Sequence, residues 1–243
     1  MALLIGMGVA ASLKAGATKA FTSGLHAVSL IELYTSEGCS SCPPAEKWLG
    51  ELRDDPGLWK TFVPVAFHVT YWDHLGWRDI YASKTYTQRQ YAYAERWASS
   101  SVYTPCFIKG GREWKPTGGQ LGSVADASPG LLTAIIDSDG SGTVAFVPAS
   151  TESLAYDVYV VRLGGGIENA VRGGENAGRK LRHDFVALSV GSLAMSKQGA
   201  VGFSAKFDAP PANQPNAPRH ALAVWVVKHG DLTPIQAAGG WLD

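Results

Sequence analysis

The sequence predicts an α/β domain with a mixed sheet flanked by helices, followed by a small antiparallel β-sandwich-like domain. Two observations support this prediction. Strand and helix patterns alternate up to residue 138, whereas five short strand patterns with turns between them fill the chain after the polar segment DSDGSG at 137–142. Glycine and proline, 28 and 13 of 243 residues, fit short elements joined by turns. We therefore expect domains at 25–138 and 143–243, after an apolar segment at 1–24.

The composition excludes several classes of protein. With 46% hydrophobic and 17% charged residues, the chain is not disordered throughout. Its 21 Lys and Arg balance 21 Asp and Glu, and no long basic run occurs, so we expect neither nucleic acid nor a membrane surface as a partner. Three cysteines are too few for a fold built on disulfides.

The N-terminal apolar run Met1–Leu13 matches the central region of a secretory signal, and the small residues Ala15 and Ala17 follow it. It is shorter than the roughly 20 residues that span a bilayer. No basic residue precedes the run, so an ordinary apolar helix is the alternative. Export predicts a periplasmic or secreted protein, whose cysteines meet an oxidising compartment.

Local patterns predict the elements of the first domain in order. Continuous apolar runs at 28–34 and 61–70 predict buried strands, and the helical pattern between them implies that the two strands are parallel. A second helix is predicted over 80–98, after an irregular aromatic loop at 71–79. The segment CFIKGGREW at 106–114 predicts a hairpin, and apolar residues on one side predict a third helix over 123–137.

The second domain is predicted to be rich in strands, with almost no helix signal. Its alternating apolar patterns predict five strands, at 143–148, 155–161, 180–190, 200–207 and 220–227. The proline-rich segment 210–218 predicts a surface loop.

The most informative motif is Cys39-Ser-Ser-Cys42, which lies between a predicted strand and a predicted helix. A helix N-terminus favours a thiolate, and lowering a thiol pKa from about 8.5 to about 7 needs only about 2 kcal/mol. Pro43 and Pro44 remove two backbone donors from the first turn, and the hydroxyls of the two serines can replace them. We therefore expect Cys39 to be the attacking thiolate and Cys42 the resolving thiol.

Thr104-Pro105 precedes the predicted hairpin, where a cis proline would form a rigid turn. Strand, C-x-x-C, helix and a later Thr-Pro before a strand together resemble the thioredoxin-like superfamily. The resemblance implies that Pro105 is cis, faces the cysteine pair and lies beside the bound substrate segment. It also suggests that Glu32 is the buried carboxylate that handles the proton of the resolving thiol, although its position is displaced by one residue.

Five further segments narrow the resemblance to the DUF1223 family: ELYTSEGCSSCPPAE, FHVTYWDHLGWRD, YTQRQ, YTP and GGENAGRKLRHDFV. The similarity extends from about Ser29 to Trp225. It implies an exported, two-domain protein with a redox-type motif and no established substrate. Within the last segment, Glu175, Asn176 and Arg179 are candidates for contacts with the first domain.

The sequence predicts a thiol–disulfide oxidoreductase-like protein that acts on protein thiols or disulfides and needs no cofactor. Thr104, Trp72 and Trp77 are the predicted substrate-binding residues, although packing of the aromatic segment on the sheet is an alternative for the tryptophans.

Two alternatives to redox activity remain open. One is a soft-metal site for copper or zinc, with ligands drawn from Cys39, Cys42, Cys106, His68 and His74. The other is a non-catalytic interaction module in which Cys39 and Cys42 form a structural disulfide. For Cys106 by itself the favoured interpretation is a buried small hydrophobic residue, since free cysteine is among the most buried residue types.

Overall fold

The computed structural model describes residues 18–116, 121, 127–150, 155–209 and 217–243. Strands make up 46% of the structure and helices 17%, so the predicted helix-flanked α/β fold of the thioredoxin type is wrong. Among the described residues, no helix is long and apolar enough to cross a membrane. The apolar run that we interpreted as a secretory signal lies at 1–13, outside the described residues.

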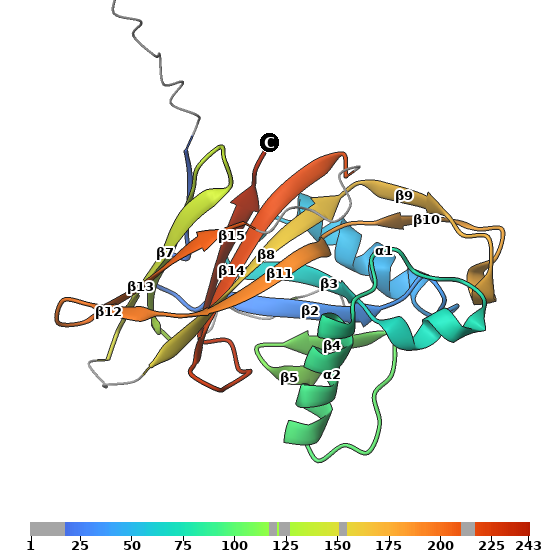
Figure 1. The fold of residues 1–243 in the computed structure, drawn as a ribbon, viewed down its shortest axis with the longest axis horizontal. Coiled ribbons are helices and arrows are strands. Elements are labelled where there is room, and N and C mark those ends of the chain that lie inside the picture. Colours follow the sequence, from blue (N-terminus) through green and yellow to red (C-terminus); the bar gives the residue numbers. More distant parts are fainter. Residues whose placement is uncertain (1–17, 117–120, 122–126, 151–154, 210–216) are drawn as a thin grey trace, which may run out of the picture.

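One large sheet extends across most of the molecule and takes strands from both halves of the chain (Figure 1). Its eight strands lie in the order β15-β14-β8-β11-β3-β2-β4-β5. In chain order their bounds are β2 Ser29–Thr35, β3 Phe62–His68, β4 Cys106–Lys109, β5 Arg112–Trp114, β8 Tyr156–Gly165, β11 Val186–Ala194, β14 Arg219–Lys228 and β15 Gln236–Trp241. The parallel neighbours β3 and β11 join the two halves, so the residues assigned to separate domains at 25–138 and 143–243 share one sheet.

A second sheet of five strands has the order β1-β6-β7-β13-β12. Its strands are β1 Lys19–Thr22, β6 Gly130–Ile136, β7 Ser141–Pro148, β12 Ser196–Gln198 and β13 Gly202–Asp208. The predicted helix over 123–137 is therefore wrong where the structure describes it. β1 and β7 pair with both edges of this segment, which makes it a strand, and this pairing overrides a periodicity that also fits a helix. Its residues alternate in burial because successive side chains of a strand point to opposite faces of the sheet.

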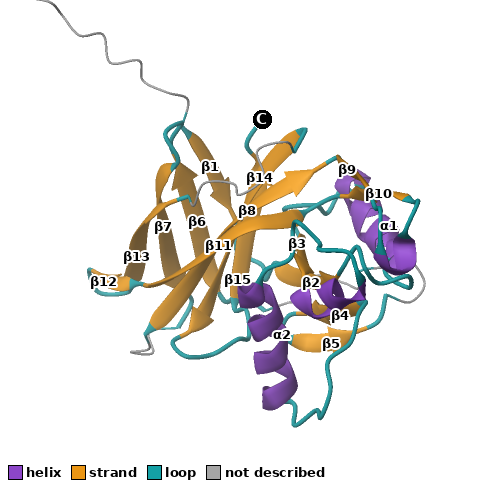
Figure 2. Ribbon diagram, turned by 45° about the vertical axis from the view of Figure 1, so that its right-hand side comes forward, coloured by secondary structure: helices purple, strands orange, loops and turns teal. Residues whose placement is uncertain are grey.

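Two α-helices cover opposite faces of the large sheet at its β2–β3–β4 end (Figure 2). Helix α1, Pro43–Glu51, begins directly after Cys42, and α2, Lys84–Arg96, confirms the helix predicted over 80–98. Three short 3-10 helices complete the helical structure of the described residues: η1 Leu52–Asp54, η2 Thr70–Leu75 and η3 Gly174–Asn176.

The strand predicted over 180–190 is two strands, because the chain bends at Asp184 and Phe185, where Phe185 has a φ of 58°. Before the bend, β10 (Lys180–His183) pairs antiparallel with β9 (Ile167–Ala170) and forms a ribbon outside both large sheets. We call residues 167–183 the β9–β10 arm. The arm extends over the N-terminal end of α1 (Figures 1 and 2).

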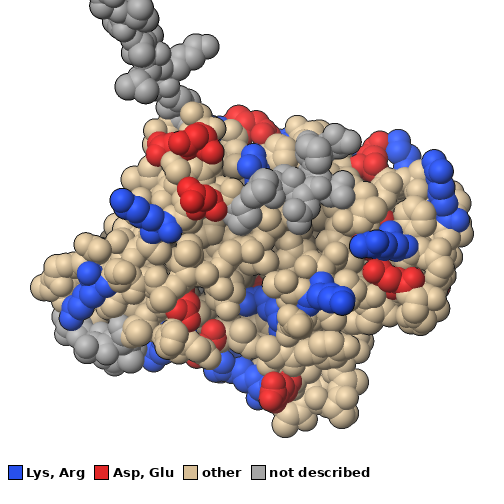
Figure 3. All heavy atoms as spheres, in the orientation of Figure 1, with Lys and Arg blue, Asp and Glu red and all other residues tan. Residues whose placement is uncertain are grey.

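The apolar core has one layer on each face of the large sheet. On one face α2 packs on the sheet through Tyr86 and Tyr93. On the other face, α1 contributes Leu49 at one end and the five-stranded sheet contributes Phe146 at the other. Charges of both signs are interspersed over the face in Figure 3, consistent with a formal net charge of zero.

Candidate functional site

The two cysteines of the C-x-x-C motif form a disulfide in the loop between β2 and α1. Their Cα atoms are 5.5 Å apart, and both residues are 0% exposed, whereas Ser40 and Ser41 between them are exposed. The Ser41 hydroxyl lies 3.3 Å from the Cys39 sulfur. The disulfide is thus closed to solvent beneath two exposed serines.

The β9–β10 arm covers the cysteine loop and is hydrogen-bonded to it. The buried amide of Asn176 donates to the carbonyl oxygens of Glu37 and Cys39, at 2.8 and 2.9 Å. Glu175 accepts from the backbone N–H and the hydroxyl of Ser40, at 2.9 and 2.6 Å. The contact expected from Glu175 and Asn176 is therefore present, and Arg179 supports it by donating to the Asn176 oxygen at 2.7 Å.

Trp72, in the aromatic segment 71–79, contacts both the cysteine loop and the Thr104–Pro105 turn. The indole N–H of Trp72 donates to the Thr104 hydroxyl at 2.7 Å. Close packing against Gly38 leaves only 3.1 Å between the Trp72 Cβ and the position of a Cβ added there, so a side chain at 38 would displace the tryptophan. The Thr104–Pro105 peptide bond is cis, as expected.

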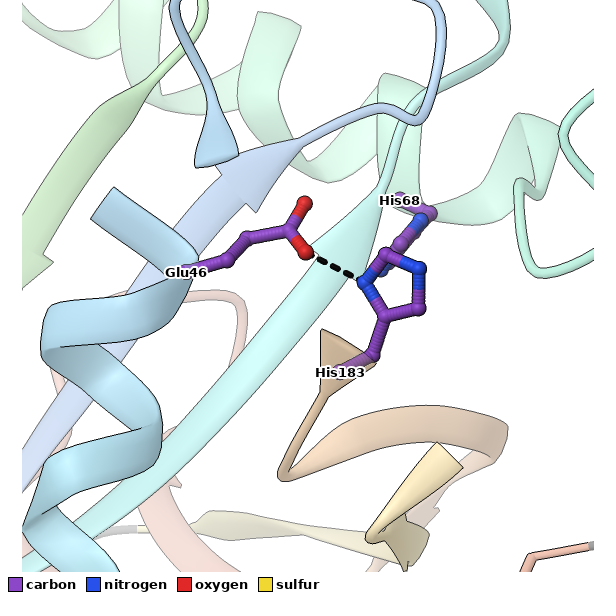
Figure 4. A group of neighbouring side chains, drawn as sticks. All are labelled: Glu46, His68 and His183. Atoms are coloured by element: carbon purple, nitrogen blue, oxygen red, sulfur yellow. Dashed lines mark hydrogen bonds and ion pairs between the residues drawn. The ribbon is translucent and has the colours of Figure 1, made fainter. Parts of the chain in front are cut away.

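Behind the disulfide lies a buried set of ionisable side chains that we call the histidine–carboxylate cluster: Glu37, Glu46, His68, Asp79 and His183. They come from the loop after β2, from α1, from the end of β3, from the segment before α2 and from the end of β10. His68 Nδ1 lies 2.7 Å from Asp79. His183 lies 3.1 Å from Glu37 through Nε2 and contacts Glu46 through Nδ1 (Figure 4).

Residues around the cluster hold its carboxylates in place. Glu37 also accepts from the indole of Trp77 at 2.8 Å and from the amide of Asn169 at 2.9 Å. The hydroxyl of Thr35 donates to Glu46 at 2.5 Å. Trp77 therefore belongs to the site, but as a hydrogen-bond donor to a buried carboxylate.

Opposite charges in the cluster stabilise one another despite burial. Burial disfavours the imidazolium form of His183, but the Glu46 and Glu37 carboxylates outweigh it and raise the pKa of His183 to about 10. Burial is outweighed in the same way at His68, whose pKa the Asp79 carboxylate raises. It is outweighed also at Glu46 and Asp79, whose carboxyl pKa values the neighbouring imidazoles lower.

Glu32 lies on the other face of the large sheet and does not take part in this site. Its carboxylate accepts from Arg89 Nε at 2.7 Å and from the hydroxyls of Tyr34 and Tyr93 at 3.0 and 2.7 Å. The role suggested for Glu32 beside the resolving thiol is therefore wrong. The side-chain period of two along a strand places residue 32 with Leu30 and Tyr34, towards α2.

The soft-metal ligand set proposed from the sequence does not assemble either. Cys106 is buried at the start of β4, and the groups that influence its thiol are Glu113, Tyr103, Gln90 and Glu32. Burial raises the pKa of this thiol to about 11. His74 is exposed and binds the backbone oxygen of Tyr71 at 2.8 Å. Only His68 of the proposed set reaches the cluster.

Sequence reasoning missed Glu37, Glu46, Asp79 and His183 as site residues. All four lie inside the three longest segments that carried the family resemblance, each close to a residue that was singled out. Their ionisable side chains, in segments otherwise defined by cysteine, glycine and aromatic residues, were the available signal.

Comparisons with known proteins agree with the family resemblance and add fold relatives. The family model DUF1223, described as a protein of unknown function, matches residues 30–227. None of the curated proteins matches the chain. The solved structure of protein AGR_C_4864 from Agrobacterium tumefaciens is 24% identical, with a TM-score of 0.63 over 88% of this chain and 94% of that chain. HBP35 of Porphyromonas gingivalis is 13% identical, with a TM-score of 0.62 over 91% of this chain and 77% of that chain.

Proposed function

The chain belongs to the DUF1223 family, and we propose that it is a thiol–disulfide oxidoreductase-like protein whose redox centre is the Cys39–Cys42 pair. The observation that supports this proposal most directly is the disulfide itself, placed at the start of α1 beneath the exposed Ser40 and Ser41. A disulfide with a structural role alone would need neither a helix start and a neighbouring hydroxyl nor the β9–β10 arm hydrogen-bonded over it.

The exchange step is reversible and balanced. In the direction that reduces the partner, the Cys39 thiolate attacks a partner disulfide and releases one partner thiolate, and Cys42 then attacks Cys39 and releases the other. The pair loses two electrons and the partner gains them. In the reverse direction a partner thiolate opens the Cys39–Cys42 bond. Partner thiols or disulfides are the only reactants, so no cofactor is required.

The cover over the disulfide makes exchange conditional on a movement of the β9–β10 arm. Both sulfurs are buried, whereas in-line attack requires the partner sulfur to reach one of them. Glu175 holds the arm to the cysteine loop through exposed contacts and Asn176 holds it through buried ones. Net contributions of such hydrogen bonds are about 1 kcal/mol each. A docking partner that competes for these contacts would open the site, next to Trp72 and Thr104.

The equilibrium potential of Cys39–Cys42 against a series of glutathione ratios tests the proposal. We expect a value between about −270 and −120 mV, the range of exchange proteins. We also expect Cys42→Ser to accumulate covalent adducts with partner proteins through Cys39. The matched control is Cys106→Ser, because Cys106 lies apart from the pair and its removal leaves both results unchanged.

A potential below about −300 mV with no adducts in Cys42→Ser would contradict the proposal, since structural disulfides resist the glutathione pool in that way. The protein would then be the non-catalytic module with a structural bridge.

We also propose a periplasmic or secreted location, supported by the apolar run at 1–13 and by the Cys39–Cys42 disulfide, since disulfides form and persist mainly in oxidising compartments. Fractionation of cells that express the full chain tests this proposal, and a protein found only in the cytoplasm would contradict it.

A further inference from the structure

We propose that Glu46, His68 and His183 form a binding site for a divalent first-row transition metal, with zinc as the representative ion. One donor atom from each side chain lies within 4.8 Å of the other two (Figure 4). The three residues come from α1, β3 and β10, so the folded chain brings together a set that no local motif contains. Two imidazoles and one carboxylate are a common ligand set for zinc and for non-haem iron.

His68 supplies the observation that points most clearly to a ligand. Its ring is 0% exposed, and its Nδ1 atom is bound to Asp79 at 2.7 Å. The Nε2 atom is buried and has no hydrogen-bond partner among the described residues. A neutral imidazole that donates Nδ1–H to a carboxylate presents the lone pair of Nε2, which is the arrangement found at metal-bound histidines.

His183 repeats this arrangement with the two nitrogens exchanged. Its Nε2 lies 3.1 Å from Glu37, and its Nδ1 contacts Glu46. Nε2–H is donated to Glu37, and Nδ1 is hydrogen-bonded to the Glu46 carboxylate. Once the proton between Nδ1 and Glu46 has left, both atoms can bind the ion. Each proton on a ligating nitrogen leaves to solvent as the ion enters, so the ion takes the position between His183 and Glu46.

Each proposed ligand is oriented by a further residue. Asp79 fixes the ring of His68, Glu37 fixes the ring of His183, and the Thr35 hydroxyl holds the second oxygen of Glu46 at 2.5 Å. Such partners are a regular feature of metal sites and strengthen them.

Charge also favours a cation at this position. Three buried carboxylates, Glu37, Glu46 and Asp79, face two imidazoles. With both rings protonated, the three carboxylates still leave one net negative charge in a buried volume. A divalent ion that replaces the two imidazole protons offsets the same two charges.

Glu46, at 6% exposure, is the proposed ligand nearest to solvent. It lines a cavity of about 420 Å³ between α1 and β10, whose wall also carries Glu51 and Asp184 beside several basic side chains. Three protein ligands leave room for water or another ligand in the remaining coordination positions. The inference does not depend on redox activity, because none of the three residues is a cysteine.

Zinc binding to the full chain without an added histidine tag tests the inference. After treatment with a chelator and dialysis, the protein is titrated with zinc chloride by calorimetry, and bound metal is measured by mass spectrometry. We expect one zinc per chain, and we expect binding to weaken more than about hundredfold in Glu46→Gln and in His183→Gln. The exposed His74→Ala is the control and should bind like the wild type.

Substitution with cobalt gives a readout that a structural role alone would not change. Nitrogen and oxygen ligands give visible d–d bands without the near-ultraviolet charge-transfer band of a cobalt–thiolate bond, and Glu46→Gln should lose these bands. Near-ultraviolet circular dichroism shows whether each variant is folded. If His183→Gln does not fold, the isosteric Glu46→Gln still tests the inference.

Absence of stoichiometric zinc in the wild type would overturn the inference, as would full zinc binding by a folded Glu46→Gln. The double variant Cys39→Ser/Cys42→Ser separates the two proposals. It should retain the zinc and lose disulfide exchange, whereas loss of zinc in this variant with retention in Glu46→Gln would assign the metal to the cysteines.

Discussion

Two buried ionic clusters lie on opposite faces of the same sheet, and they are built differently. Under α2, one carboxylate, Glu32, pairs with one guanidinium, Arg89, and two tyrosine hydroxyls complete its contacts. Arg89 also lies over the rings of Tyr159 and Trp225, at 4.9 and 5.1 Å from their centroids. We call this the Glu32–Arg89 pair. Its charge is balanced by its own members.

On the α1 side, the histidine–carboxylate cluster has three carboxylates, two imidazoles and a buried imidazole nitrogen without a partner. It lies beside the disulfide and the arm that covers it. The comparison teaches that burial of charge does not by itself indicate function. Each cluster has a buried nitrogen without a partner among the described residues, Nη1 of Arg89 in the first and Nε2 of His68 in the second. The excess of carboxylates distinguishes the second cluster, and only the imidazole nitrogen can offer a lone pair to an ion.

Removing Arg89 should have the largest effect. Arg89→Met leaves the Glu32 carboxylate buried without its cation, and we expect a loss of about 3–5 kcal/mol in the free energy of unfolding, measured by urea titration. Adding Glu32→Gln should restore part of the loss. A loss below about 1 kcal/mol would show that Glu32 does not depend on Arg89 for its charge balance.

Asp79→Asn tests the second cluster without changing a proposed ligand. The amide no longer holds the His68 ring with a charged acceptor, so zinc affinity should fall about 10-fold to 100-fold in calorimetry. The exposed turn variant Asp139→Asn serves as the control. Unchanged zinc affinity in Asp79→Asn would mean that Asp79 does not orient a ligand.

Asn176→Ala weakens the cover over the disulfide. It removes two hydrogen bonds to the cysteine loop, each contributing about 1 kcal/mol, so reduction by dithiothreitol should be at least about tenfold faster. Arg172→Ala changes an exposed residue of the same arm and should leave the rate as in the wild type. Equal rates in all three proteins would show that the arm does not control access.

The smallest effect concerns Arg96, which ends α2 on the side of the Glu32–Arg89 pair and binds Asp231. Burial raises the pKa of the Asp231 carboxyl, but its bond with Arg96 and with backbone N–H groups outweighs this and lowers it from 3.8 to about 2. The depressed pKa in the folded state means that the pair stabilises the protein above pH 3.8 and loses this contribution as the pH falls towards 2.

For this partly exposed pair we expect Arg96→Ala to be less stable than the wild type by under about 1 kcal/mol at pH 7. Urea titrations at pH 7 and pH 2 measure the difference, which should be smaller at pH 2. A difference that grows on acidification would contradict the assignment.

Much of the cysteine site could be predicted from the sequence because its signals are local. The apolar run before Cys39, the helical pattern after Cys42 and the Thr104–Pro105 dipeptide are each contained in a short segment. Glu32 was misplaced because a one-residue shift along a strand moves a side chain to the opposite face of the sheet. Cys106 and His74 were included for their chemistry alone, and their positions in the fold separate them from the cluster.

The sequence by itself determined where most strands and both α-helices lie, which cysteines are near enough to bond, and which family the chain resembles. Only the tertiary structure decided that β6 is a strand, that both halves share one sheet, and that His183 meets Glu46 across 137 residues of chain. Periodicity and turn chemistry act over a few residues, so they fix local structure. Strand order and the meeting of distant side chains depend on which apolar faces pack together, and that is a property of the whole chain.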